Sequence, residues 1–295
     1  MRIAVFGTGG IGGYIGANLC AQGDDVTLVA RGQHLEAIRS RGLRVVEDDR
    51  NYTVYPDHAV DDDGLEGIYD LVLLCVKSYD ITNAIETLRP HLSADSIVLP
   101  LANGVDHFDK IAASLDVQLL RGCCYILSHI ESPGVIRKQG KVFAAVFGTE
   151  KYPEGLERTA GCFKKAGLRY KTPDNIDTAV WKKYLFISAF ASLTSYYDSS
   201  IKTVYTSHRD EAEAILNEIA AVALAKGIEI GDEIVKALET ASALPEEAST
   251  SMHLDFQKGK ASELDSLSGY IVKEGERLGV ATPVMEKLYT GLRNR

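Results

Sequence analysis

The pattern of hydrophobic and polar positions changes about midway along the chain. In the first half, short aliphatic and β-branched runs alternate with segments of helical length. The runs read, in order, RIAVFG, DVTLVAR, LRVVE, DLVLLCVKS, SIVLPLANG and KVFAAVFG. Strands that alternate with helices are typical of βαβ units, and continuous apolar runs are typical of buried strands in a parallel sheet. We therefore predict an α/β domain in the first half.

The second half is predicted to be helical. After the segment YKTPDNIDTAV, apolar residues recur at helical spacing nearly to the end of the chain. Residues 210–227 end in a glycine, and Thr282 precedes Pro283 as a plausible cap at the start of another helix. The turn residues KTPDN mark a junction. We expect an α/β domain over residues 1–169 and an all-helical domain over residues 170–295.

Composition and charge narrow the class of protein. A chain of 295 residues favours two domains, and a formal net charge of −9 argues against binding to a nucleic-acid backbone. Five scattered cysteines with no C-x-x-C pair indicate reduced thiols and no metal site. The chain has no run of about 18 apolar residues, so no membrane span is predicted. Glycines interrupt the N-terminal apolar stretch too often for a signal peptide. We expect a cytoplasmic protein.

A glycine-rich turn near the N-terminus predicts a cofactor. It follows an apolar strand, opens a helix and has the form G-x-G-x-x-G, with residues Gly7, Thr8, Gly9, Gly10, Ile11 and Gly12. In this motif the first glycine permits a tight turn, the second lets a pyrophosphate approach the backbone, and the third lets helix and strand pack closely. An isolated motif could be a flexible loop, but a second strand follows at the expected distance, from Asp25. We predict a Rossmann-type dinucleotide-binding domain.

The residue that ends the second strand indicates NADPH/NADP as the cofactor. An acid at that position hydrogen-bonds the ribose 2′-OH of NAD, whereas an arginine accommodates the 2′-phosphate of NADP. This chain has Arg31 there, while Asp24 and Asp25 lie at the beginning of the strand and not at its end. Lys77 follows another buried strand at the edge where such sheets bind ligands, and could add a second cation. The alternative is that both are solvated surface charges.

Two lysines in the segment WKKYLFISAFASLT lie beside residues that are otherwise apolar or small. One of them could donate a proton, since reduction of a ketone needs a donor near the developing oxyanion. The alternative is that Lys182 and Lys183 both extend their ammonium groups to solvent from a helix start. Residues 185–193 are mostly apolar all round, so periodicity does not choose between the two lysines.

Several motifs, in order along nearly the whole chain, resemble the ketopantoate reductase (2-dehydropantoate 2-reductase) family. They are GTGGIGG near the N-terminus, Arg31, VKS at 76–78, ANGV at 102–105, SPGVIRKQG at 132–140, WKK at 181–183 and SELD at 262–265. The resemblance implies NADPH-dependent reduction of 2-dehydropantoate to (R)-pantoate, a step towards pantothenate and coenzyme A. A small-molecule 2-oxo acid is then the expected partner, and a homodimer could form through the helical domain.

The resemblance also assigns roles to individual residues. It makes Lys183 the general acid, places Asn103 between cofactor and substrate, and puts Glu263 near the reaction centre, where it also meets the cofactor. Ser251 would hold the substrate carboxylate, and Arg31 with Lys77 would read the 2′-phosphate. Two of these residues could instead have purely structural roles: Ser251 could be a helix cap, and Glu263 could be an acid that favours a helix start.

Two positions depart from the family pattern. Ile187 and Ala191 occupy the places, one and two turns after Lys183, where the family usually has asparagines that contact substrate. Loss of such polar partners should alter substrate choice more than reaction type. The alternatives are therefore a related NADP-dependent reductase for a different, less polar 2-oxo acid, with Ile187 and Ala191 lining its pocket, or a non-catalytic NADP-binding sensor.

Overall fold

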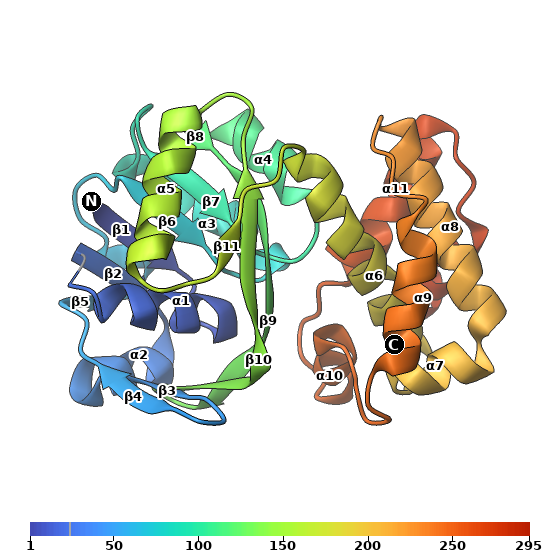
Figure 1. The fold of residues 1–295 in the computed structure, drawn as a ribbon, viewed down its shortest axis with the longest axis horizontal. Helices are drawn as coiled ribbons and strands as arrows, with labels where there is room; N and C mark the ends of the chain where they lie inside the picture. Colours follow the sequence, from blue (N-terminus) through green and yellow to red (C-terminus); the bar gives the residue numbers. More distant parts are fainter. Residues whose placement is uncertain (24) are drawn as a thin grey trace. The chain divides into compact units, whose positions relative to one another are not determined.

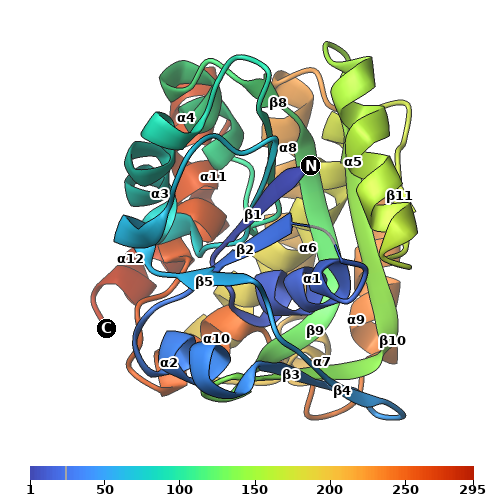
Figure 2. The same cartoon turned by 90° about the vertical axis from the view of Figure 1, so that its left-hand side faces the viewer.

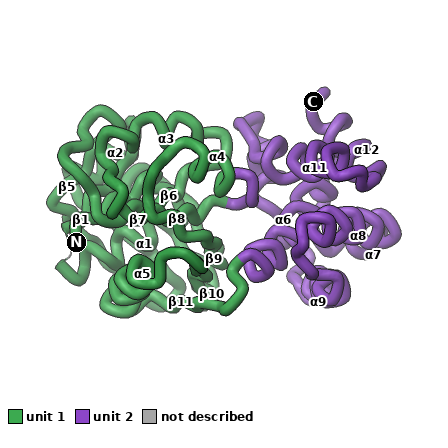
Figure 3. Tube along the Cα trace, turned by 90° about the horizontal axis from the view of Figure 1, so that it is seen from above, with its two compact units in different colours: residues 1–102, 107–176 green, residues 103–106, 177–295 purple. Residues whose placement is uncertain are grey.

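The computed structural model describes residues 1–23 and 25–295, so Asp24 lies outside the described residues. The chain divides into two compact units (Figure 3). Unit 1 contains residues 1–102 and 107–176, and unit 2 contains residues 103–106 and 177–295. The division after Ile176 falls a few residues beyond the junction expected from the sequence. A four-residue loop, 103–106, groups with the helical unit although the chain on both sides of it belongs to unit 1.

Unit 1 is built around a parallel sheet (Figures 1 and 2). Among the described residues six strands form it, in the order β5 (His58–Val60), β2 (Asp25–Val29), β1 (Arg2–Phe6), β6 (Leu71–Leu74), β7 (Ile97–Pro100), β8 (Gln118–Leu119). Counted along the chain within this sheet, the order is 3-2-1-4-5-6, which is the Rossmann order. The order reverses between β1 and β6, and sheets of this type bind ligands at the carboxyl ends of strands beside such a reversal.

A second sheet contains two of the runs that we expected in the parallel sheet. Within the described chain it comprises β11 (Tyr170–Lys171), β10 (Val135–Gly148), β3 (Leu43–Val46), β4 (Asn51–Val54) and β9 (Arg121–Ser132). LRVVE forms β3, and only residues 47–50 separate it from β4, too few for a crossover helix, so the two pair antiparallel. KVFAAVFG forms the end of β10, which returns antiparallel to β9 after Pro133 and Gly134.

Helices and the second sheet cover the parallel sheet. Alternate residues of β1 enter two cores: Ile3 and Val5 enter the core that contains α1 and strands of the second sheet, while Ala4 and Phe6 enter the core beneath α3. The helices of this unit are α1 (Gly10–Cys20), α2 (Gly32–Arg41), α3 (Ile81–Leu88), α4 (His107–Ser114) and α5 (Pro153–Lys165). In the described part of this unit, short 3-10 turns lie between β5 and β6 (η1, Asp62–Gly64), between β6 and α3 (η2, Ser78–Asp80) and between α3 and β7 (η3, Arg89–His91).

Unit 2 is helical, as the sequence predicts. Its elements are α6 (Ile176–Tyr197, all but its first residue), α7 (Ile201–Ser207), α8 (Arg209–Ala225), α9 (Glu233–Ala243), α10 (Ser251–Gln257), the π-helix η4 (Asp265–Gly269), α11 (Tyr270–Leu278) and α12 (Pro283–Arg293). In the part of the chain that the structure describes, no helix combines the length and apolar character needed to cross a bilayer.

The start of α12 corrects one detail of the sequence analysis. Thr282 holds the cap position and Pro283 the first helical position, but the Thr282 side chain makes no capping hydrogen bond. Instead, the Glu218 carboxylate of α8 accepts hydrogen bonds from the backbone N–H groups of Val284 and Met285, at 2.8 and 2.9 Å. A carboxylate satisfies both donors at once and also favours the positive end of the helix dipole.

Candidate active site

The glycine-rich turn of unit 1 has the geometry that a dinucleotide requires. Gly7 adopts φ +96°, which L side chains rarely reach. A Cβ on Gly12 would lie 2.2 Å from the Gly7 carbonyl oxygen, so a side chain there would separate α1 from the strand. A Cβ on Gly9 would meet no described atom within 4 Å. The backbone at Gly9 is therefore open to a ligand, whereas Gly7 and Gly12 serve the turn itself.

The first turn of α1 fits a phosphate group. The helix begins at Gly10 and carries no acidic residue in its first turn, so no carboxylate of that turn repels an anion at its positive end. Thr8 is buried, and its hydroxyl donates to the Val29 carbonyl oxygen at 2.9 Å, which ties the turn to the end of β2. Ile11 packs partly buried against the core. These features sit beside the reversal of strand order, where Rossmann sheets bind dinucleotides.

The two cations expected to read a 2′-phosphate lie at the carboxyl ends of strands in the same sheet. Arg31 follows β2 and precedes α2. Lys77 follows β6, is partly buried, and directly precedes η2. Arg31 is paired with two carboxylates, Asp62 and Asp80, an arrangement that the sequence did not predict.

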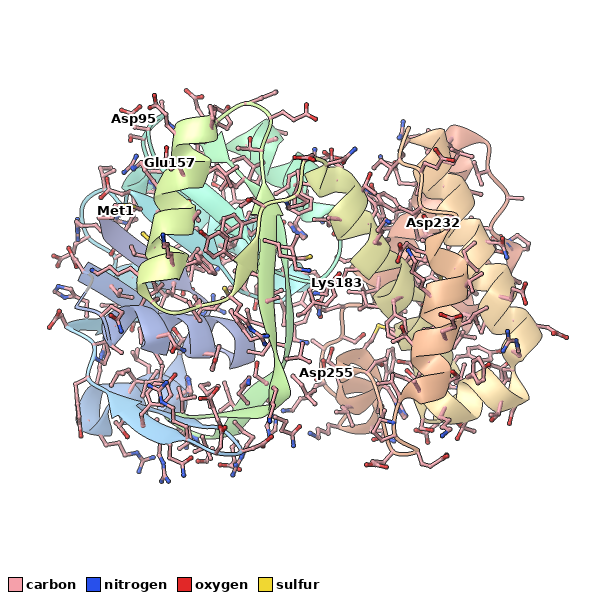
Figure 4. All side chains as sticks on the ribbon, in the orientation of Figure 1. Met1, Asp95, Glu157, Lys183, Asp232 and Asp255 are labelled. Atoms are coloured by element: carbon pink, nitrogen blue, oxygen red, sulfur yellow. The ribbon has the colours of Figure 1, made fainter. Side chains whose placement is uncertain are left out.

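In unit 2 the two lysines of the WKK segment have different partners (Figure 4 labels Lys183 on α6). Lys182 forms ion pairs with Glu233 at 2.8 Å and with Asp232 at 3.6 Å, near the start of α9. Lys183 instead donates a hydrogen bond to the Asn103 amide oxygen at 3.0 Å. Lys182 therefore has a structural partner, and Lys183 is the lysine that meets the other candidate site residues.

Asn103 links Lys183 to Glu263. Its amide nitrogen lies 3.4 Å from the Glu263 Oε2 atom, while its amide oxygen accepts from the Lys183 ammonium. Glu263 is only 2% exposed. The amide thus turns its acceptor to a cation and its donor to an anion, which fixes its orientation. Three residues far apart in the sequence form one hydrogen-bonded set inside unit 2.

The loop that carries Asn103 is held at two points. Gly104 adopts φ +99° directly after Asn103, so the chain turns sharply there. Asp106 lies three residues after Asn103, and Ser266 lies three residues after Glu263. The Ser266 hydroxyl donates to the Asp106 carboxylate at 3.3 Å. The Asn103–Glu263 and Asp106–Ser266 contacts together anchor the loop to the segment that precedes α11.

A row of hydroxyl groups on α6, which was not predicted from the sequence, fixes the same segment. Tyr184 donates to the carbonyl oxygens of Ser266 and Leu267 at 3.0 and 2.7 Å, and Ser188 also donates to Leu267 at 2.8 Å. Ser192 pairs with Ser268 at 2.7 Å. Burial, helped by the negative charge of Asp106, raises the pKa of Tyr184 well above its ordinary value, so its hydroxyl remains a donor.

These hydroxyl groups explain how a π-helix is tolerated directly after Glu263. In the wide turn of η4, carbonyl oxygens of Ser266 and Leu267 face α6 and accept from its side chains. π-helical turns occur frequently at functional sites. The signal in the sequence was present: hydroxyl groups recur every four residues, at 184, 188 and 192, on a helix that is otherwise largely apolar.

The remaining predicted site residues are placed as follows. Ile187 is partly buried and Ala191 is 2% exposed, one and two turns after Lys183 on α6. Ser251 is exposed at the first position of α10. The cap of that helix is Thr250, whose hydroxyl accepts from the His253 N–H and also pairs with Thr194 of α6 at 2.9 Å. Ser251 is therefore not the cap, because its neighbour takes that role.

Known proteins resemble this chain over nearly its whole length. The family "Ketopantoate reductase PanE/ApbA" matches residues 3–149, and its C-terminal counterpart matches residues 175–295. The 2-dehydropantoate 2-reductase of Pyrococcus abyssi is 30% identical over 99% of this chain and 96% of its own. The "Uncharacterized oxidoreductase YkpB" of Bacillus subtilis is 28% identical over 99% of this chain and 98% of its own.

A solved structure agrees equally well. The PanE/ApbA family ketopantoate reductase of Ralstonia eutropha JMP134 superposes with a TM-score of 0.92 at 30% identity, covering 100% of this chain and 98% of that one. Members of this family are NADPH-dependent enzymes, so the sensor alternative is set aside. The chain belongs to the ketopantoate reductase family and is an NADP-dependent oxidoreductase that acts on CH–OH groups.

Proposed function

We propose that the protein reduces the ketone of 2-dehydropantoate to (R)-pantoate, with Lys183 as the general acid. The observation that carries the proposal is the 3.0 Å hydrogen bond from the Lys183 ammonium to Asn103, whose amide also meets the buried Glu263. A ketone reductase needs a proton donor at a fixed position, and this set supplies one with its orientation restrained.

The chemistry assigned to these residues is a proton transfer. NADPH, when bound, would supply the hydride for the ketone carbon, and negative charge would develop on the ketone oxygen. Lys183 gives that oxygen a proton, which completes the hydroxyl group, and recovers a proton from water. Asn103 holds the ammonium, and Glu263 balances its charge. Ser251 is proposed to bind the substrate carboxylate, and Arg31 and Lys77 to bind the 2′-phosphate. Asn103 and Glu263 are also proposed to contact the cofactor.

A second candidate is the reduction of a 2-oxo acid with a hydrocarbon side chain. Ile187 and Ala191 lie on α6 one and two turns after Lys183 and offer no hydrogen-bonding group to a substrate hydroxyl. A pocket without a polar partner does not stabilise a bound hydroxyl group, so discrimination in favour of the pantoyl skeleton would be weak. This observation concerns substrate choice and leaves the roles of Lys183, Asn103 and Glu263 unchanged.

A panel of 2-oxo acids tests both candidates. NADPH oxidation should be measured with 2-dehydropantoate, straight and branched aliphatic 2-oxo acids, and an aromatic 2-oxo acid. A kcat/KM above about 10⁴ M⁻¹s⁻¹ for 2-dehydropantoate, and higher than for the others, would support the first candidate. A value below about 10³ M⁻¹s⁻¹ beside a better hydrocarbon substrate would favour the second.

The proposal extends to the metabolic role, the cellular compartment and the domain roles of the protein. If 2-dehydropantoate is the substrate, the product enters pantothenate and coenzyme A synthesis in the cytoplasm. The five scattered cysteines of the sequence contain no C-x-x-C pair, a usage that suits reduced thiols in a reducing compartment. We propose that residues 1–169 bind the cofactor and residues 170–295 supply the acid. The homodimer stays a prediction, to be checked by mass measurement in solution.

A further inference from the structure

Arg31 is engaged by a carboxylate of its own chain. Its guanidinium donates two hydrogen bonds to Asp62, from Nε to Oδ1 at 3.3 Å and from one terminal nitrogen to Oδ2 at 2.5 Å. The Arg31 side chain is 52% exposed and that of Asp62 is 24% exposed. A guanidinium binds a carboxylate and a phosphate through the same pair of parallel donors. Asp62 therefore occupies the donors that a 2′-phosphate would use.

The register of the sheet makes this pairing a property of the fold. Strands β2 and β5 are parallel neighbours, and Val29 pairs with Val60. Arg31 lies two residues beyond Val29, and Asp62 lies two residues beyond Val60. Both side chains therefore leave the sheet at the same edge and at the same level, and the β2–β5 pairing continues through a hydrogen bond from the Ala30 N–H to the Val60 carbonyl at 2.9 Å.

A second acid approaches the same guanidinium from another strand connection. Asp80, at the end of η2, has a carboxylate oxygen 3.9 Å from the other terminal nitrogen of Arg31. Lys77 directly precedes the same short turn. Two cations and two anions thus share this edge of the sheet, so the net charge of these four side chains is zero. A 2′-phosphate, which carries up to about −2 charge, must displace or face these carboxylates.

We propose that Asp62 is a cofactor-selectivity residue that lowers the preference of this enzyme for NADPH over NADH. The inference rests on the proposed role of Arg31 in binding the 2′-phosphate. Asp62 competes with the phosphate for the Arg31 donors. Its carboxylate also stands at the sheet edge where an acid can accept a hydrogen bond from the ribose 2′-OH of NADH. The enzyme therefore binds both cofactors, with a preference for NADPH smaller than Arg31 and Lys77 alone would give.

Equilibrium binding tests the proposal without any turnover. NADPH and NADH differ only in the 2′-phosphate, and each is titrated against the full chain by nicotinamide fluorescence with no oxo acid present. In Asp62→Asn we expect the ratio of the NADH dissociation constant to the NADPH dissociation constant to rise by about fivefold, the upper range for an exposed ion pair. In Asp80→Asn, which removes the more distant carboxylate, the ratio should rise less.

A matched control separates direct competition from general charge. Asp63→Asn removes the same charge from the adjacent, exposed position, so its ratio should change less than about twofold. An equal change in Asp62→Asn and Asp63→Asn would overturn the proposal. So would a fall of the ratio in Asp62→Asn, because Asp62 would then hold Arg31 in place for the phosphate.

The result also separates this inference from the proposed function. Intact binding of both cofactors with an unchanged ratio in Asp62→Asn would overturn only the inference. If the protein bound neither NADPH nor NADH, both the inference and the proposed function would be overturned. Failure of every oxo acid to support NADPH oxidation, with the ratio shifted as expected, would overturn only the substrate assignment.

Discussion

The Lys183 ammonium and the Asn103 amide oxygen lie 3.0 Å apart, although 80 residues separate them in the sequence. Lys183→Ala should lower kcat by about 10²- to 10⁴-fold, the usual contribution of a positioned acid, and leave the NADPH dissociation constant nearly unchanged. Steady-state kinetics and fluorescence titration measure the two effects. Lys182→Ala is the control, since Lys182 pairs with Glu233. A Lys183→Ala enzyme with more than about a tenth of the original kcat would remove the general-acid role.

Ile187 offers a test of substrate choice. Ile187→Asn should raise kcat/KM for 2-dehydropantoate by about three- to tenfold relative to a branched aliphatic 2-oxo acid, because the amide can pair with the substrate hydroxyl. Ile187→Leu keeps the side chain apolar and should leave the ratio of the two kcat/KM values within about twofold. An unchanged ratio in Ile187→Asn would show that this position does not contact the substrate.

Gly9 and Gly12 should respond differently to one added methyl group. A Cβ at Gly9 meets open space, so Gly9→Ala should keep its melting temperature but weaken NADPH binding by about tenfold or more, as the methyl takes the position of a phosphate. A Cβ at Gly12 would lie 2.2 Å from the Gly7 carbonyl, so Gly12→Ala should lower the melting temperature as well. Scanning calorimetry and cofactor titration distinguish the two. Equal losses of stability would contradict the assignment of Gly9.

The Tyr184 hydroxyl should stabilise the helical unit. Tyr184→Phe leaves the buried carbonyl of Ser266 without this donor and weakens the bonding of Leu267, so we expect a loss of about 1 to 3 kcal/mol. Trp181, the single tryptophan, packs against Tyr184 with ring centroids 5.4 Å apart, and its fluorescence reports urea-induced unfolding there. Tyr55→Phe, at a 75% exposed position, should change stability by less than about 0.5 kcal/mol. Similar effects in both variants would refute the role of the hydroxyl row.

Glu274 should make the helical unit sensitive to acid. Hydrogen bonds from Arg277, followed by those from Lys226, lower the pKa of Glu274 from 4.5 to about 2. Because the pKa is lowered by folding, the stabilisation is fully present above pH 4.5 and is lost as pH falls towards 2. Glu274→Gln should cost about 1 to 2 kcal/mol at pH 7 and progressively less below pH 4.5, measured by urea unfolding. Glu276→Gln, at an exposed neighbouring position, is the control and should change stability at pH 7 by less than about 0.5 kcal/mol.

Features set by neighbouring residues could be predicted from the sequence. The glycine-rich turn, the strand before it and the helix after it depend on local backbone requirements, and the structure has all three. The placement of LRVVE and KVFAAVFG in a second sheet could not be predicted, because both apolar runs resemble buried parallel strands. The strands with which they pair are determined by the length of the connections. A short connection in one case and a two-residue turn in the other decide the pairing.

The choice between Lys182 and Lys183 shows the same limit at the candidate site. Lys182 and Lys183 are adjacent on the same half-buried stripe of α6, so helical periodicity does not choose between them. Their partners come from distant segments, Glu233 for one and Asn103 for the other. The pairing of Arg31 with Asp62 likewise depends on the register of two strands, which no local pattern encodes.

The grouping of residues 103–106 with the helical unit has a consequence for dissection of the protein. The polypeptide passes from one unit to the other after Ala102, returns after Asp106 and passes again after Ile176. A single cut at 176 would thus yield a C-terminal fragment that retains Lys183 and Glu263 but lacks the amide that joins them. Such a fragment would carry the cation and the anion without the amide that bridges them. Recombination with a relative should therefore take residues 103–106 and 177–295 from the same parent.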